Sequence, residues 1–236
     1  MKILCYVNHY FGEPVGFRGR STDPDAEGRR EIVSACLAHL RSLPGVEVYV
    51  CGIDGRSLEP IDIPFPHVRD NPTMLVYESL AHMAKRIDEG YDYFINIEDD
   101  ILLPAVTLAN LIEFDKESLL NEVLHPNRLE QDGAGTPYCV DMKALPGGTF
   151  QRRQYRGREL CVANNPHSAL LLLSRDKLRY VLRHGDIEYR GRFLGVGMES
   201  ALAYYHGPFC LYRSFEDLAF HTVTHLDPSP SSPGTP

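Results

Sequence analysis

The sequence predicts an α/β protein built on a mostly parallel central sheet with flanking helices. Strand-like and helix-like patterns alternate along the first half of the chain, which is the order of βαβ units. The run 93–97 is almost wholly apolar, as expected of a parallel strand that is covered on both faces. The length of 236 residues suits one domain. We expect residues 1–226 to form it and the Pro/Ser-rich residues 227–236 to form a disordered tail.

The first half is expected to contain three strands and three helices. Residues 3–7, 46–51 and 93–97 are strand-like. Apolar residues at helical spacing predict a first helix from about residue 24 or 29 to 43. Asn71 and Pro72 resemble an N-cap and the first position of a second helix, which ends near Gly90. The third helix covers roughly 105–120.

The second half is less regular. Periodicity fades over residues 126–165, and a stretch of this kind inside a domain is usually functional or mobile. Order returns with a strand at 169–173 and a helix capped by Ser174. A short helix from Glu199 and strand-like segments around Cys210 and Phe220 follow.

Composition excludes several classes of function. The formal net charge of -8 provides no basic field for nucleic acid or an anionic membrane. The apolar run 169–173 is far shorter than the ~20 residues of a membrane span. The apolar run in the first seven residues is too short for a signal peptide. The six cysteines form no Cys-x-x-Cys pair. We therefore expect a reduced, cytoplasmic protein. The glycine-rich phosphate loops of common nucleotide folds are missing from the sequence.

The strand at 93–97 runs directly into three acidic residues, Glu98, Asp99 and Asp100. Open α/β sheets bind ligands beyond the carboxyl ends of such strands. Three adjacent carboxylates repel one another, and a divalent cation with oxygen ligands would offset that repulsion. The simpler alternative is that these acids complement the dipole of the following helix.

Two later segments also carry candidate chemistry. Gly195 and Gly197 precede Glu199, which falls in the first turn of a predicted helix and could either meet a ligand or complement the helix dipole. In a strand, His221 and His225 would share one face about 13 Å apart, too far for both to bind one ion. Each could instead be a hydrogen-bonded core histidine.

The acidic strand end, about a hundred residues into a βαβ-type N-terminal half, resembles the Asp-x-Asp motif of GT-A-type glycosyltransferases, with Glu98 in place of the first Asp. The resemblance extends to the first strand and its loop, and to the second strand followed by Asp54-Gly55-x-Ser57. It covers most of residues 1–226 in architecture, but only short motifs in sequence.

This resemblance implies that a sugar is transferred from a UDP- or GDP-linked donor to a carbohydrate or other hydroxyl acceptor, with Mn²⁺ or Mg²⁺ as cofactor. In this scheme Glu98 and Asp100 hold the metal with His221 or His225, and Glu199 is the general base of an inverting reaction. Asp99 lies near the ribose or the metal-bound waters. The nucleotide and substrate contacts are then Asn8, Arg18, Arg20, Asp54, Asn165 and His167.

Two other functions are compatible with the same residues. One is a metal-dependent sugar-phosphate nucleotidyltransferase, which usually carries a basic glycine-rich loop after the first strand. Residues 12–20 match such a loop poorly. The other is a non-catalytic module that binds a nucleotide sugar.

Overall fold

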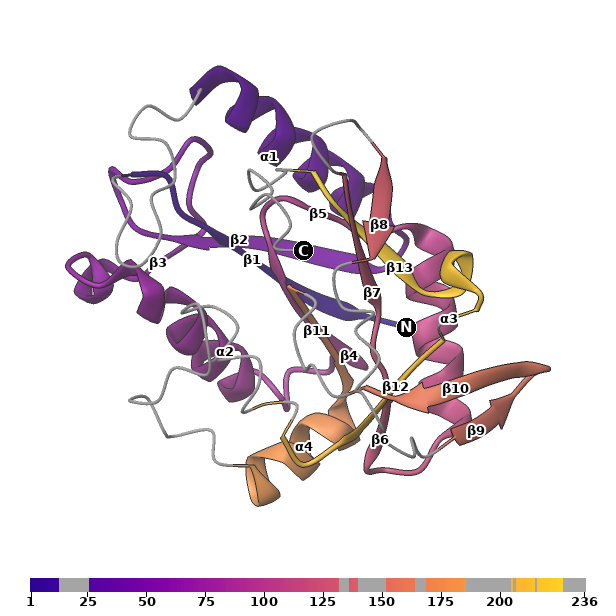
Figure 1. Cartoon of the computed structure of the whole chain (residues 1–236). Helices are drawn as coiled ribbons and strands as arrows, with labels where there is room; N and C mark the ends of the chain where they lie inside the picture. Colours follow the sequence, from indigo (N-terminus) through magenta and orange to yellow (C-terminus); the bar gives the residue numbers. More distant parts are fainter. Residues whose placement is uncertain are drawn as a thin grey trace.

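Figure 1 shows the computed structural model of the chain, in which helices lie on both sides of a central sheet. The structure describes residues 1–12, 26–131, 136–139, 152–163, 169–185, 205, 207–214 and 216–226. Within these ranges no helix has the length and apolar character needed to cross a membrane.

The central sheet has five strands in the order β11–β4–β1–β2–β3. Four of them are parallel, and β11 runs antiparallel to its neighbour β4. Every residue of β1 is buried, as a strand covered on both faces requires. The prediction of an α/β protein with a mostly parallel central sheet is confirmed. These strands are β1 (Ile3–His9), β2 (Val46–Gly52), β3 (Ile63–Pro64), β4 (Tyr93–Glu98) and β11 (Leu170–Ser174).

Helices cover both faces of this sheet. Alternate residues of β1 point to opposite sides, so that Ile3 and Val7 pack with α1 and α3, whereas Leu4 and Tyr6 pack with α2 and α4. Figure 1 shows α1 and α2 on opposite sides of the sheet. The core is therefore divided into two apolar layers. The helices are α1 (Ala26–Ser42), α2 (Leu75–Lys85), α3 (Ala105–Glu117) and α4 (Arg175–His184).

Two smaller sheets lie beside the central one, in the orders β6–β12–β10–β9 and β5–β13–β7–β8. Four of their strands fall inside the stretch 126–165, which we expected to be irregular, so that prediction was wrong for the described part of it. Those strands are rich in polar residues and lack a clear apolar period. The eight strands are β5 (Ile101–Leu102), β6 (Glu122–Leu124), β7 (Asn127–Gln131), β8 (Pro137–Cys139), β9 (Arg152–Tyr155), β10 (Arg158–Val162), β12 (Cys210–Arg213) and β13 (Thr222–His225).

The second helix begins and ends differently from the prediction. Asn71 precedes a short 3-10 helix and makes no side-chain capping bond there. At the other end α2 stops at Lys85. The following turns are closed by i→i−3 bonds such as Arg86 N–H to Met83 C=O, and this tighter winding ends the α-helix before Gly90. The 3-10 helices are η1 (Pro66–Val68), η2 (Pro72–Met74) and η3 (Leu218–Phe220).

Candidate functional site

The acidic triplet lies where the connectivity of the central sheet changes direction. β1 has β2 on one side and β4 on the other, although β4 follows β3 along the chain. Ligands of open α/β sheets bind at such a switch point, outside the carboxyl ends of the strands. β1 ends at His9 and β4 ends at Glu98, so Asp99 and Asp100 follow at this edge.

Arg29, in the first turns of α1, holds two of the three acids together. Its Nη1 donates to Asp100 Oδ2 at 2.9 Å, and its Nη2 donates to Asp99 Oδ1. The Arg29 side chain is only 13% exposed, so water screens these pairs weakly. Part of the positive charge that the sequence argument assigned to a cation is thus provided by the chain itself.

His9 fixes the other side of Asp99. Its Nδ1 lies 2.5 Å from Asp99 Oδ2, and its Nε2 lies 2.8 Å from the backbone nitrogen of Leu58. Because Nε2 must accept the Leu58 N–H, the ring carries its proton on Nδ1 and donates it to Asp99. Both carboxylate oxygens of Asp99 therefore have partners, and its orientation is fixed.

His225 lies between two carboxylates. Its Nε2 is 3.3 Å from Asp100 Oδ2, an ion-pair contact that is not aligned as a hydrogen bond, and its Nδ1 is 3.3 Å from Glu130 Oε1. Burial by itself would lower the pKa of His225. The contacts with Asp100 and Glu130 outweigh burial and raise that pKa to about 9.

The two outer acids of the triplet have opposite electrostatic environments. For Asp100, burial is outweighed by the contacts with His225 and Arg29, which hold its pKa well below the usual range. For Glu98, burial and the charge of Asp100 raise the pKa above its usual range, against the opposing effect of His225 and Arg128. Neighbouring carboxyl groups with pKa values pushed apart are typical of functional sites.

One carboxylate oxygen of this cluster has no partner in the part of the chain that the structure describes. Asp100 is 3% exposed, and its Oδ1 is buried with no hydrogen-bond partner among the described residues. An unsatisfied buried oxygen is costly, so this atom marks a position where a donor or a cation would be stabilised.

The other late histidine has different neighbours. His221 is fully buried, and its Nε2 accepts a hydrogen bond from the backbone N–H of Ser214 at 3.0 Å. Burial, with a smaller effect of Arg213, lowers the pKa of His221 to about 3. Of the two histidines, His225 is the one that contacts the acidic triplet.

The predicted nucleotide contacts that the structure describes lie in two settings. Asn8 is buried, and its amide bonds to Asn96 at 2.6 Å and to Ser79 at 2.5 Å, which joins β1, β4 and α2. Asp54 is exposed in the turn after β2, next to Gly55 with its positive φ of 74°. The remaining predicted site residues, Arg18, Arg20, Asn165, His167 and Glu199, lie outside the described residues.

The described carboxylate and histidine side chains around Asp100 are of types that bind divalent cations, but they are not arranged around one position. Carboxylates and a histidine are ligands that Mn²⁺ accepts, and Asp100 Oδ1 is available. However, within the described ranges no group of three or more His, Cys, Asp or Glu side chains is arranged to hold a metal ion. Arg29 and His225 both lie against the other oxygen of Asp100.

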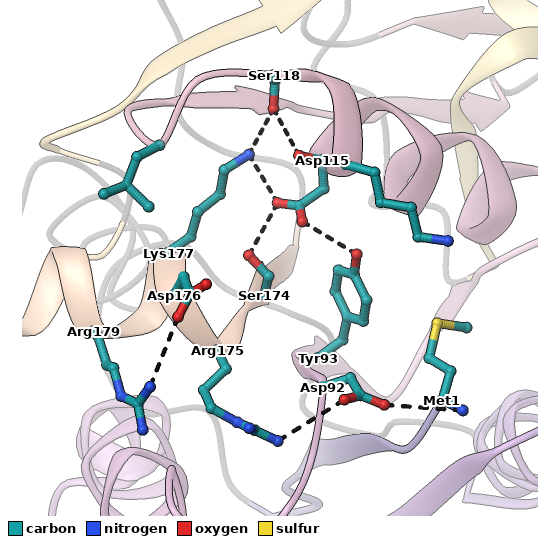
Figure 2. Close-up of a pocket in the computed structure, with 12 residues that line it drawn as sticks. Met1, Asp92, Tyr93, Asp115, Ser118, Ser174, Arg175, Asp176, Lys177 and Arg179 are labelled. Carbon is teal, nitrogen blue, oxygen red and sulfur yellow. Dashed lines mark hydrogen bonds and ion pairs between the residues drawn. The ribbon is translucent and has the colours of Figure 1, made fainter.

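A separate cavity of about 730 Å³ lies at the opposite end of the central sheet. Figure 2 shows Lys177 reaching Asp115 and Ser118 inside it. Lys177 Nζ is 2.8 Å from both Asp115 Oδ1 and Ser118 Oγ, and Tyr93 and Ser174 donate to the same carboxylate. These polar groups satisfy one another and tie α3 to α4, so we assign the cavity no chemistry.

No family model matches the chain, and no curated protein matches it. Many solved structures are similar to the chain, and two of them at low identity are the following. One is described as a glycosyltransferase involved in the glycosylation of the major capsid of PBCV-1, at 10% identity over 97% of this chain and 95% of the other, with a TM-score of 0.42. The other is a protein from STIV, at 11% identity over 100% and 99% of the two chains, with a TM-score of 0.44.

Proposed function

We propose that the chain is a GT-A-like glycosyltransferase that moves a sugar from a UDP- or GDP-linked donor to a hydroxyl acceptor with a divalent cation. The observation that carries the proposal is the buried Oδ1 of Asp100, which has no partner in the described part of the chain and lies at the switch point of a mostly parallel sheet. Such an oxygen needs a donor or a cation, and the strand end is where a ligand would bring one.

We assign the cation, Mn²⁺ or Mg²⁺, to Asp100, Glu98 and His225, whose side chains would have to move together around it, because no such group is already arranged for a metal within the described ranges. His225 contacts Asp100, whereas His221 bonds to Ser214, so His221 is left out of this set. A bound cation would neutralise the charge that develops on the leaving nucleoside diphosphate.

The chain's own residues would orient the substrates and move a proton. Asp99, held by His9 and Arg29, presents a carboxylate of fixed orientation near the ribose or the waters around the cation. Glu199 would accept the proton of the acceptor hydroxyl as general base, with inversion at the anomeric carbon. Following the sequence resemblance, we place Asn8, Arg18, Arg20 and Asp54 near the nucleotide, and Asn165 and His167 near sugar hydroxyls.

Calorimetric titration of UDP and of GDP, each with Mn²⁺ and with EDTA, tests the proposal. We expect one nucleotide to bind in Mn²⁺, and we expect EDTA or Asp100→Asn to abolish this binding. Asp176→Asn is the matched control, since Asp176 is an exposed aspartate on α4. If the folded protein binds neither nucleotide, or binds equally well in EDTA, the proposal is wrong.

Turnover separates the transferase from the two alternative functions. Glu199→Gln is expected to keep donor affinity and to lose hydrolysis or transfer of the sugar. A nucleotidyltransferase would instead release pyrophosphate from a nucleoside triphosphate and a sugar phosphate. A binding module would show donor affinity without turnover in the unmodified chain.

A further inference from the structure

Two carboxylates from different segments of the chain contact His225. β13 lies between β5 and β7, with His225 opposite Ile101 and Thr224 opposite Leu129. Continuing the parallel register with β7 places the residue after Leu129 opposite His225. The residue before Ile101 lies one position further along, opposite Leu226, whose N–H donates to its carbonyl. The two residues are Glu130 and Asp100, and each has a carboxylate oxygen 3.3 Å from a different ring nitrogen of His225.

Glu130 is itself held in place. It is 7% exposed, and its Oε2 accepts a hydrogen bond from the Tyr138 hydroxyl at 3.1 Å. Arg128 Nη2 is 3.4 Å from the Oε1 that also faces His225. Turning this carboxylate away would leave a buried charge without its partners, which is costly. The sequence around Glu130 shows only a polar segment, so this role could not be inferred without the fold.

We propose that Glu130 is a positioning residue that holds His225 by Nδ1 and so directs Nε2 toward Asp100 and the cation. This inference rests on the proposed function. A histidine that binds a metal through one ring nitrogen almost always donates its other N–H to a carboxylate, carbonyl or water, which fixes the tautomer and the ring orientation. Here the strand register supplies that carboxylate from β7.

The first measurement needs no metal. In ¹⁵N-labelled protein, the Nδ1 proton of His225 is expected to be protected from exchange and shifted downfield by its bond to Glu130. The signal should disappear in Glu130→Ala and persist in Glu130→Gln, whose amide oxygen can still accept. Glu159→Gln, on the separate β9–β10 hairpin, is the control. An unchanged signal in Glu130→Ala would overturn the inference.

The second measurement is the affinity for Mn²⁺ alone, measured by calorimetry. Loss of a carboxylate of this kind typically weakens metal binding about 10–100-fold, and we expect a weakening of this size in Glu130→Ala. In a His225→Gln background the same change should have no further effect, because Glu130 acts through that ring. An equal weakening in both backgrounds would indicate general damage and contradict the inference.

The two measurements distinguish the failure of this inference from the failure of the proposed function. If the unmodified chain binds no Mn²⁺, the metal assignment is wrong, and the Nδ1 signal alone decides whether Glu130 positions the ring. If Mn²⁺ binds and Glu130→Ala leaves both its affinity and the Nδ1 signal unchanged, the metal assignment stands and the role of Glu130 does not.

Discussion

Arg29 is the residue on which the charge balance of the site depends most. It bridges Asp99 and Asp100, which are 4% and 3% exposed. Removing one partner of a buried ion pair usually costs about 3–5 kcal/mol, because the remaining charge is left uncompensated. We therefore expect Arg29→Met to lower the free energy of unfolding by about that amount in EDTA, as measured by urea denaturation.

The same variant reports whether the acids accept a cation. If Mn²⁺ can supply the missing positive charge, it should restore stability, by roughly 2.7 kcal/mol at a concentration one hundred times its Kd. Arg179→Met is the control, because Arg179 pairs with Asp88 at the surface and such a pair is worth at most about 1 kcal/mol. Destabilisation without any response to Mn²⁺ would count against a cation at these carboxylates.

His221 should make stability depend on pH. Its pKa is lowered from 6.5 to about 3 in the folded chain, so the folded state favours the neutral ring. The stability that this provides is fully present above pH 6.5 and is lost progressively as pH falls toward 3, by at most about 1.4 kcal/mol per pH unit.

Urea denaturation of the unmodified chain and of His221→Gln between pH 7 and pH 5 measures this contribution. Glutamine can still accept the Ser214 N–H but does not titrate, so the difference in unfolding free energy between the two proteins should shrink as pH falls. A difference that does not change with pH would show that the His221 ring does not resist protonation.

At the scale of elements, the strands that the sequence predicts correctly are those with a clear apolar pattern. β1, β2 and β4 are recognisable because each is a short run of mostly apolar residues. The β9–β10 hairpin is not, because its charged residues obscure the strand period. In the structure those charges are paired, for example Arg152 with Glu159 across the hairpin and Arg153 with Glu122. Such pairs become visible only once the strands are aligned.

The residues of the candidate site could likewise be predicted only in part from the sequence. The acidic triplet could be found because it directly follows a buried strand. His9 also ends a strand, and the strand-end rule could have identified it. Arg29 and Glu130 could not be found in this way, because Arg29 reaches the triplet from α1 and Glu130 reaches His225 from β7, both across long separations in the sequence. Their residue types carry no signal until the register is known.

At the scale of the whole molecule, the two ends of the central sheet carry different structures. The carboxyl end holds a charged cluster in which Asp100 Oδ1 has no partner among the described residues. The amino end holds the 730 Å³ cavity, in which Lys177 and Asp115 satisfy each other. The chemistry of the buried groups favours the carboxyl end as the binding site, because a ligand there would satisfy a group that the described part of the chain does not.

Hydrogen exchange measured by mass spectrometry decides between the two ends. Addition of Mn²⁺ and UDP or GDP should slow amide exchange in peptides covering residues 8–12, 53–58 and 98–102, which end or follow β1, β2 and β4. These amides are expected to respond because ligand binding raises the free energy of local opening. Peptides covering 115–120 and 174–179, which line the cavity, should exchange at an unchanged rate. Protection confined to the cavity peptides would move the nucleotide site to the amino end, and the acidic triplet would then be a structural cluster neutralised by Arg29 and His225.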